Sequence, residues 1–309
     1  MSNSLLIDTD PGVDDALAIL MAHAYGDVVG LTVTAGNVGL VHTLGNALKL
    51  VEVIGADTPV FAGCPVPLVL PADDAAFVHG ADGFGDTGYT RSSRSAHAEH
   101  AALAILRLAD EHAGELTLVA LGPLTNLALA LRLDGGLPKR VRRLVVMGGA
   151  VNGRGNTGHV PAEFNIGFDP EAAHVVFSEW PDFDLVDWEA TLRHGLEFGT
   201  VERWLDADDA RARFYAAISR RTRDWTRAHG RPLLAVADAL AMAVALEPDI
   251  VSASARHHVA VELTGMHTRG ATVVDWEDRN GSAPNARIVL AVDQTRFEAL
   301  VAGALGAMI

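Results

Sequence analysis

Short apolar runs alternate along this chain with longer segments of helical periodicity. The expected strands are Leu5–Asp8, Val28–Ala35, Pro59–Ala62, Leu116–Leu121, Leu144–Met147 and Phe183–Val186. The expected helices between them are Asp14–Tyr25, Thr43–Ile54, Ala98–His112, Leu124–Leu131 and Pro170–Phe177. Strand–helix alternation of this kind is typical of α/β folds, so we expect a mostly parallel central sheet with helices on both faces.

The last part of the chain departs from this alternation. Three further segments indicate additional C-terminal strands in a hairpin-like annex: His258–Leu263, Ala271–Asp275 and Ala286–Val292. Ala299–Met308 is expected to be a closing helix. Because there is no repeat, low-complexity linker or break in composition, residues 1–309 are predicted to form a single Rossmann-like α/β domain.

Composition excludes several classes of protein. The formal net charge of −15 argues against a nucleic-acid partner, which would require a basic face. The single cysteine, Cys64, excludes an internal disulfide and a multi-cysteine metal site. The longest apolar stretches, such as Leu233–Leu246, are too short to span a membrane, and the N-terminus lacks the basic region of a signal peptide. We therefore expect a soluble cytoplasmic protein with no membrane partner. The basic stretch from Arg203 to Arg231 is interrupted by acids and is interpreted as a solvated helical face or subunit contact.

Four aspartates lie within eight residues where the first expected strand leads into the first expected helix: Asp8, Asp10, Asp14 and Asp15. Carboxylates this close repel one another unless they are neutralised, and a hard divalent cation such as Ca²⁺ or Mg²⁺ would do so. Acids in a first helical turn are also common as caps, so either of the last two alone would indicate only a helix start.

Other polar segments follow later expected strands. They are Gly36-Asn37, Gly122 to Asn126, and Gly148-Gly149. In parallel sheets ligands bind outside the carboxyl ends of the strands, so we expect these segments to gather around the acidic one.

These segments resemble the signatures of the nucleoside hydrolases, the inosine–uridine-preferring N-ribohydrolase family. The matching stretches, in family order, are Asp8 to Ala16, Thr34 to Val38, His79 to Gly83, Leu121 to Asn126, Met147 to Ala150, Ala162 to Ile166, Asp169 to Ala173 and Asp238 to Ala241. They extend over about four-fifths of the chain.

The resemblance implies a Ca²⁺-dependent enzyme that hydrolyses the N-glycosidic bond of ribonucleosides to free base and ribose. By matched position, the metal ligands would be the carboxylates of Asp10, Asp15 and Asp238 and the backbone carbonyl of Leu121. An all-oxygen shell suits Ca²⁺, although the residues alone do not separate Ca²⁺ from Mg²⁺. Asp10 would also be the catalytic base that activates a water held by the metal. The family forms dimers and tetramers, so a homodimer or homotetramer is expected.

The resemblance also assigns substrate contacts. Asp14, Asn37 and Asn165 match positions that bind ribose hydroxyls, and Glu163 and Asn156 match positions that bind the 5′-hydroxyl. Asn156 is a less secure match, because its spacing to Glu163 is one residue longer than usual. The remaining predicted substrate contacts are Met147 against the ribose, His79 in the irregular stretch from Pro65 to Ser95, and Trp188 against the base.

One position departs from the family pattern. Inosine–uridine-preferring members have a histidine directly before the last metal aspartate, where it is thought to protonate the leaving base; this chain has Ala237. Either another group protonates the base, or aromatic stacking raises the basicity of a purine, which favours a purine preference. The candidate stacking residues are Trp188, Trp225 and Trp276, and the candidate acids are His79, His194 and Glu189.

Two other functions stay open on the sequence. A Ca²⁺-dependent nucleoside- or ribose-binding protein without turnover would keep the sugar-binding residues, although binding alone does not need the base Asp10. An aspartate-nucleophile phosphohydrolase would fit the Asp8-Thr9-Asp10 segment, but neither Lys49 nor Lys139 lies where a phosphate-binding lysine is required.

Overall fold

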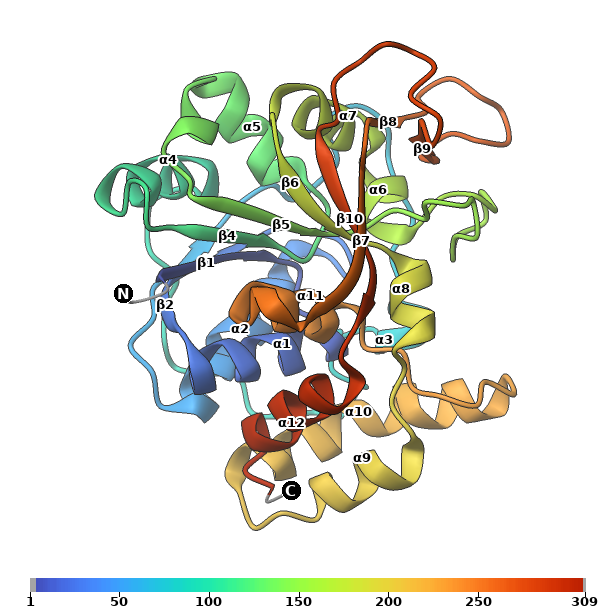
Figure 1. Ribbon diagram of the computed structural model, residues 1–309. Helices are drawn as coiled ribbons and strands as arrows, with labels where there is room; N and C mark the ends of the chain where they lie inside the picture. Colours follow the sequence, from blue (N-terminus) through green and yellow to red (C-terminus); the bar gives the residue numbers. More distant parts are fainter. Residues whose placement is uncertain (1–3, 308–309) are drawn as a thin grey trace.

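An eight-stranded sheet forms the centre of the computed structural model, which describes residues 4–307 (Figure 1). In sheet order the strands are β3 (Val60–Ala62), β2 (Asp27–Val33), β1 (Ser4–Thr9), β4 (Thr117–Ala120), β5 (Arg143–Met147), β6 (Phe183–Val186), β10 (Ala286–Val292) and β7 (Val251–His257). All neighbouring pairs are parallel except β10 and β7. The order 3-2-1-4-5-6 is that of a doubly wound α/β fold, so the predicted fold class is confirmed.

Helices connect and cover these strands. They are α1 (Val13–Tyr25), α2 (Leu40–Ile54), α3 (Ala76–His79), α4 (Ala101–Glu111), α5 (Thr125–Leu133), α6 (Phe164–Phe168), α7 (Pro170–Glu179), α8 (Trp188–Arg193), α9 (Phe198–Leu205), α10 (Ala210–Ala228), α11 (Ala237–Leu246) and α12 (Gln294–Ala304), with short 3-10 turns at Leu137–Lys139 and Pro248–Ile250. Within the described residues, none of these helices has the length and apolar character needed to cross a membrane.

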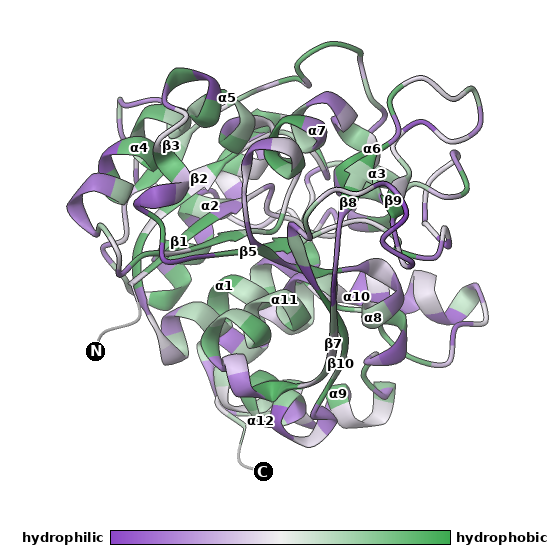
Figure 2. Ribbon diagram, turned by 45° about the horizontal axis from the view of Figure 1, so that its top comes forward, coloured by the Kyte–Doolittle hydropathy of each residue, from purple (hydrophilic) through white to green (hydrophobic). Residues whose placement is uncertain are grey.

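Two apolar clusters lie on opposite faces of the sheet. One joins α1, α2, α11 and α12, and the other joins α4, α5 and α7. Figure 2 shows the corresponding pattern, with hydrophobic residues concentrated on the central strands and on α1 and α11. The central strands read as continuous apolar runs because both of their faces are buried. Every residue of β1 is buried. This buried strand holds the start of the acidic segment that follows it in a fixed position.

The C-terminal part of the chain differs from the expected annex. Only β8 (Val259–Val261) and β9 (Thr272–Val274) form a separate antiparallel pair. The segment Ala286–Val292 is instead strand β10 of the eight-stranded sheet, where it pairs in parallel with β6. Its antiparallel partner β7 was not expected, because four of its seven residues are exposed at the sheet edge and give no apolar run. The closing helix begins at Gln294, five residues before the predicted start, and the last residue of the prediction, Met308, lies outside the described residues.

Candidate active site

The polar segments expected at one edge of the sheet do meet there. β1 and β4 are neighbours in the sheet. The chain continues from β1 to β2 and β3 on one side of β1, and then returns to β4 on the other side. The carboxyl ends of β1 and β4 therefore form the switch point at which doubly wound folds open a crevice. Asp10 follows β1 and Gly122 follows β4. A Cβ atom at Gly122 would lie 2.4 Å from Asp10 Oδ1, and one at Gly36, after β2, would lie 2.0 Å from Asp10 Oδ2. Glycine is therefore required on both sides of the Asp10 carboxyl group.

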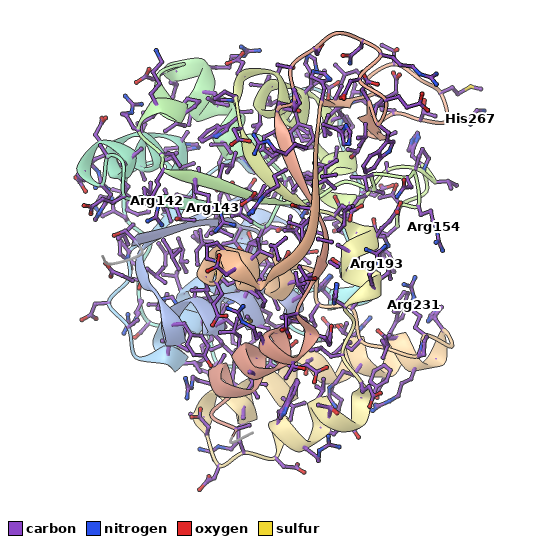
Figure 3. The ribbon with its side chains drawn as sticks, viewed as in Figure 1. Arg142, Arg143, Arg154, Arg193, Arg231 and His267 are labelled. Carbon is purple, nitrogen blue, oxygen red and sulfur yellow. The ribbon has the colours of Figure 1, made fainter. Side chains whose placement is uncertain are left out.

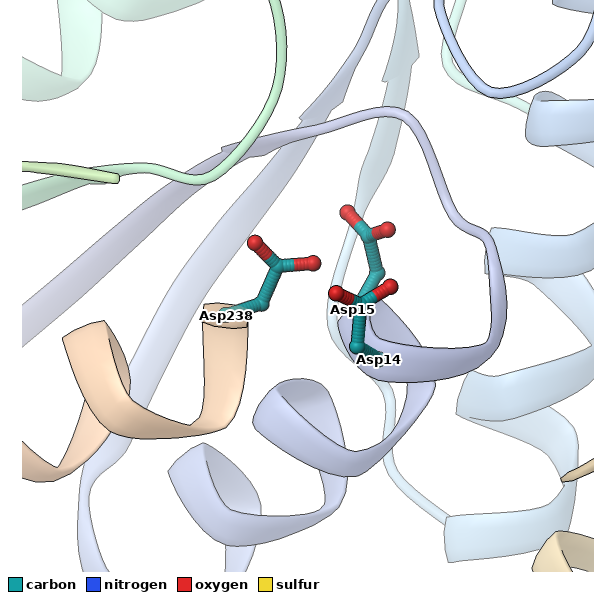
Figure 4. A group of neighbouring side chains, drawn as sticks. All are labelled: Asp14, Asp15 and Asp238. Carbon is teal, nitrogen blue, oxygen red and sulfur yellow. The ribbon is translucent and has the colours of Figure 1, made fainter. Parts of the chain in front are cut away.

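Asp14, Asp15 and Asp238 bring their carboxyl groups together across two helix starts. Asp14 and Asp15 lie in the first turn of α1, and Asp238 lies in the first turn of α11, which packs beside α1. One oxygen from each of the three lies within 4.8 Å of the others. Figure 4 shows Asp238 directed toward the other two carboxyl groups. Residues more than two hundred positions apart thus form one acidic group.

Asp15 also caps its own helix, as the alternative interpretation of the sequence suggested. Its Oδ2 accepts a hydrogen bond from the backbone N–H of Gly12 at 3.0 Å, and its Oδ1 accepts one from the hydroxyl of Thr9. The side-chain amide of Asn37 donates to Asp15 Oδ2 at 3.0 Å. Asp15 therefore both caps α1 and belongs to the acidic group, because α1 begins at the site.

The carboxyl group of Asp10 has one oxygen that accepts a hydrogen bond and one that has no hydrogen-bond partner among the described residues. Its Oδ2 accepts a 2.6 Å hydrogen bond from the backbone N–H of Asn37. Its Oδ1 is buried and has no hydrogen-bond partner in the part of the chain that the structure describes. A buried carboxylate oxygen without a partner is costly, so this atom indicates a place where a ligand or ion completes the site.

Burial controls the protonation of all four carboxyl groups. It raises the pKa of Asp10 and of Asp238 well above the usual range, and repulsion from neighbouring carboxylates adds to the effect at both. Burial raises the pKa of Asp14 to about 6, and burial followed by the charge of Asp14 raises the pKa of Asp15. A divalent cation would reverse this balance, because its charge favours the ionised form of every carboxyl group around it. The all-oxygen donor set and the free Asp10 Oδ1 fit a hard cation.

A second wall of the site is built from β4, β5 and α6. The side-chain amide of Asn165 donates to the carbonyl oxygen of Leu121 at 2.6 Å and to that of Met147 at 3.2 Å. Glu163 is the N-cap of α6, and its carboxyl group accepts hydrogen bonds from the backbone N–H groups of Gly149, Asn165 and Ile166. Burial raises the pKa of Glu163 to about 7.

His79 faces the start of α1 from the irregular stretch between β3 and α4. Its Nδ1 accepts a hydrogen bond from the backbone N–H of Val13 at 3.1 Å, so the proton of the neutral ring resides on Nε2. Burial lowers the pKa of His79 to about 4, although the charge of Asp15 opposes the effect. The ring is consequently a neutral donor rather than an imidazolium.

One cavity joins the residues predicted from the sequence. Ten of them line it: Asp14, Asn37, His79, Leu121, Met147, Asn156, Glu163, Asn165, Trp188 and Asp238. Asp10 and Asp15 do not line the cavity, but each accepts a hydrogen bond from Asn37, which does. Ala237 and Trp225 are also part of the cavity wall.

Several other candidates lie elsewhere. Asp8 is buried behind the site, where its Oδ1 accepts hydrogen bonds from Thr32 and Asn126. His194 bonds to the backbone N–H of Val292, and Glu189 binds the backbone of the loop at residues 152–154, so neither candidate acid reaches the cavity. Trp276 packs against His257 and is likewise absent from the cavity wall.

Apart from Trp225, the cavity residues of α10 were not expected from the sequence. The interpretation of residues 203–231 as a solvated helical face or subunit contact covers only part of this stretch, because another face of α10 lines the cavity. Its residues are Tyr215, Ser219, Thr222, Arg223, Trp225 and Thr226. Most of these recur at spacings of three and four, the repeat of a helical face, which was the available signal. Arg231, labelled in Figure 3, lies just beyond α10 and also lines the cavity. Phe77 meets Trp225 edge-on, with ring centroids 6.1 Å apart.

Comparison with known proteins shows to which family the chain belongs. The family model described as "Inosine-uridine preferring nucleoside hydrolase" matches residues 5–299. The chain is 34% identical to the inosine-uridine preferring nucleoside hydrolase of Crithidia fasciculata, covering 99% of this chain and 98% of that protein. It is 36% identical to the non-specific ribonucleoside hydrolase RihC of Salmonella enteritidis, covering 96% of each. The solved structure of an inosine-guanosine nucleoside hydrolase superimposes with a TM-score of 0.92, at 34% identity over 99% of both chains.

The fold, the acidic cavity and these comparisons together define a hydrolase with a doubly wound α/β fold. The chain belongs to the nucleoside hydrolase family and is a ribonucleoside N-ribohydrolase.

Proposed function

We propose that this protein hydrolyses ribonucleosides, with a preference for purines, in a Ca²⁺-dependent reaction for which Asp10 is the base. The observation that carries the proposal is the free, buried Oδ1 of Asp10 beside the group formed by Asp14, Asp15 and Asp238. Asp10, Asp15, Asp238 and the carbonyl oxygen of Leu121 would hold the ion. When bound, Ca²⁺ would supply positive charge that lowers the pKa of a water molecule and binds vicinal hydroxyl groups.

The residues of this chain would divide the remaining work. Asp14, Asn37 and Asn165 would bind the ribose hydroxyls, while Glu163 and Asn156 would bind the 5′-hydroxyl and Met147 would pack against the sugar. Asp10 would accept a proton from the attacking water as its oxygen bonds to the anomeric carbon. The electron pair of the broken C–N bond would leave on the nucleobase, and the sugar would pass through an oxocarbenium-like state.

Base preference would follow from the aromatic wall. Trp188 and Trp225 line the cavity, whereas the position of the usual histidine acid is Ala237. Stacking on a purine raises its basicity, and pyrimidines gain less from it, so purine nucleosides are the preferred substrates. The inosine-guanosine nucleoside hydrolase among the similar structures supports this preference. His79, a neutral donor at the cavity wall, would contact the substrate.

The test is a panel of inosine, adenosine, guanosine, uridine and cytidine, each assayed for free ribose with Ca²⁺ and again after chelation. Release from purine nucleosides that depends on Ca²⁺ is the expected result. Binding of nucleosides without release from any of them would show a Ca²⁺-dependent binding protein instead. Membership of the family argues against the phosphohydrolase.

Three further expectations need their own tests. A homodimer or homotetramer would be recognised by its mass in light scattering, and a cytoplasmic location by fractionation of the cells that make the protein. A role in purine salvage or nucleoside catabolism would follow from the purine preference.

A further inference from the structure

Tyr215 presents a hydroxyl group to the active-site cavity that has no partner. The residue lies on the inner face of α10, is 1% exposed and lines the cavity. Its Oη is one of the few buried polar side-chain atoms between residues 4 and 307 that form no hydrogen bond. Buried hydroxyl groups in folded proteins are nearly always bonded, so this one requires an explanation.

The other hydroxyl groups on this face of α10 all take part in hydrogen bonds within the protein. Arg223 donates from Nε to the hydroxyl of Ser219 at 3.2 Å and from Nη2 to the carbonyl oxygen of Ala216 at 3.1 Å. The hydroxyl of Thr222 donates to the carbonyl oxygen of Val78, and that of Thr226 donates to the carbonyl oxygen of Thr222. Among the hydroxyl groups that this face of α10 places in the cavity wall of the described structure, that of Tyr215 is the one that forms no hydrogen bond.

The charges around Tyr215 keep it a hydrogen-bond donor. Burial raises the pKa of its hydroxyl, the negative charges of Asp14 and Asp238 raise it further, and the positive charge of Arg223 opposes them. The group is therefore a protonated phenol whose charged neighbours are carboxyl groups of the acidic group and one guanidinium.

The two walls of the cavity determine what meets this hydroxyl. The sheet edge and α6 carry the groups suited to sugar hydroxyls, including Asn165 and Glu163, whereas α10 carries Trp225. A ribonucleoside held by its sugar against the first wall must direct its base toward the second. Tyr215 lies on the α10 wall but interacts electrostatically with Asp14 and Asp238. We therefore expect it near the glycosidic bond, between the sugar and the base.

We propose that the Tyr215 hydroxyl donates a hydrogen bond to the nucleobase and stabilises the negative charge that the base gains as the glycosidic bond breaks. This inference rests on the proposed function. The electron pair of the C–N bond passes to the base, water supplies the new C–O bond, and its proton goes to Asp10. The base takes up its proton from solvent, and Tyr215 keeps its own. A donor aimed at developing charge in a buried site assists the reaction without a pKa matched to proton transfer.

The test compares two ribosides that share the sugar and differ in the leaving group. Inosine needs stabilisation of its departing base, whereas 4-nitrophenyl riboside releases a nitrophenolate that is stable as an anion. In Tyr215→Phe, kcat/KM for inosine should fall by about 100-fold, the effect of removing one preorganised donor, while the value for 4-nitrophenyl riboside should change little. The Ca²⁺ requirement should be unchanged.

Tyr25→Phe is the matched control, since it makes the same chemical change at a half-exposed residue of α1. Its rates with both substrates should equal those of the wild type. Thermal unfolding of Tyr215→Phe should show no loss of stability, because the hydroxyl has no partner to lose.

Three outcomes separate the possible errors. Equal losses with both substrates would place Tyr215 at the sugar or the metal and overturn the inference. Unchanged inosine hydrolysis would also overturn it. A wild-type protein that cleaves 4-nitrophenyl riboside and no nucleoside, or cleaves neither, would show instead that the proposed function is wrong.

Discussion

The side-chain amide of Asn165 donates a 2.6 Å hydrogen bond to the backbone carbonyl oxygen of Leu121. A carbonyl oxygen has two lone pairs, so this bond leaves one free to bind the proposed ion while it fixes the direction of the carbonyl group. The same amide donates to the carbonyl oxygen of Met147. One side chain thus links a proposed metal ligand to a residue proposed to contact the ribose.

Asn165→Ala should therefore weaken Ca²⁺ binding and substrate binding together. We expect a loss of about 10- to 100-fold in Ca²⁺ affinity, the usual effect of removing a group that orients a metal ligand. Calorimetric titration of the chelated protein measures it. Asn152→Ala is the control, because the side chain of the exposed Asn152 donates to Glu189 outside the cavity. Equal affinities in the wild type and Asn165→Ala would show that Leu121 needs no such support.

The arrangement of these residues was partly readable from the chain. Asp10, Asp15 and Asn37 follow strands whose apolar runs were clear, and parallel strands bring their carboxyl ends to one edge. The bond between Asn165 and Leu121 was not readable, because it depends on the packing of α6 against β4. His194 looked like a free candidate acid, but its partner Val292 lies 98 positions further on.

The α10 wall shows a different limit of the sequence. Its many arginines led to the interpretation of a solvated helical face or subunit contact. Tyr215 is nevertheless buried, because it faces α1 and the cavity, while the arginines of α10 other than Arg223 lie outside the cavity wall. Composition averaged over a helix hides a narrow functional face, and the positions along that face reveal it.

Removal of the metal should make stability depend on pH. Without a cation, burial raises the pKa of Asp14 from 3.8 to about 6 and that of Asp8 from 3.8 to about 7. The folded protein then binds more protons than the unfolded chain in this range, so its stability should fall as the pH rises from about 4 to about 7. Thermal unfolding of the chelated protein across this range measures the trend.

Restoring Ca²⁺ should reverse that trend at neutral pH. At a concentration about 100 times its dissociation constant, the ion should raise the unfolding midpoint by roughly 5 °C. In mildly acidic solution the increase should be smaller, because protons compete for the same carboxyl groups. An equal increase at both pH values would mean that the ion binds outside the acidic group.

Glu163→Gln should impair recognition of the 5′-hydroxyl. The glutamate accepts hydrogen bonds from three backbone N–H groups, and a glutamine amide would present donor hydrogens to at least one of them. Comparison of inosine with 5′-deoxyinosine is the measurement. The wild type should discriminate between them by about 100-fold or more in kcat/KM, and the variant should lose most of that ratio. Unchanged discrimination would assign the 5′-hydroxyl to other residues; Glu171→Gln, at an ion pair with Arg269 outside the cavity, is the control.

Asp10→Asn separates catalysis from folding. The substitution removes the proposed base and the negative charge but keeps the size of the side chain, so turnover of inosine should fall by at least about 1000-fold. Because a buried carboxyl group with a raised pKa destabilises the folded state when it ionises, the metal-free variant should unfold at a higher temperature than the metal-free wild type at neutral pH. Ca²⁺ should stabilise the variant less than it stabilises the wild type. Assays of ribose release and thermal unfolding, each with and without chelator, measure all three effects. Near-normal turnover in Asp10→Asn would remove Asp10 as the base, and a lowered metal-free midpoint would show that its carboxyl group supports the fold.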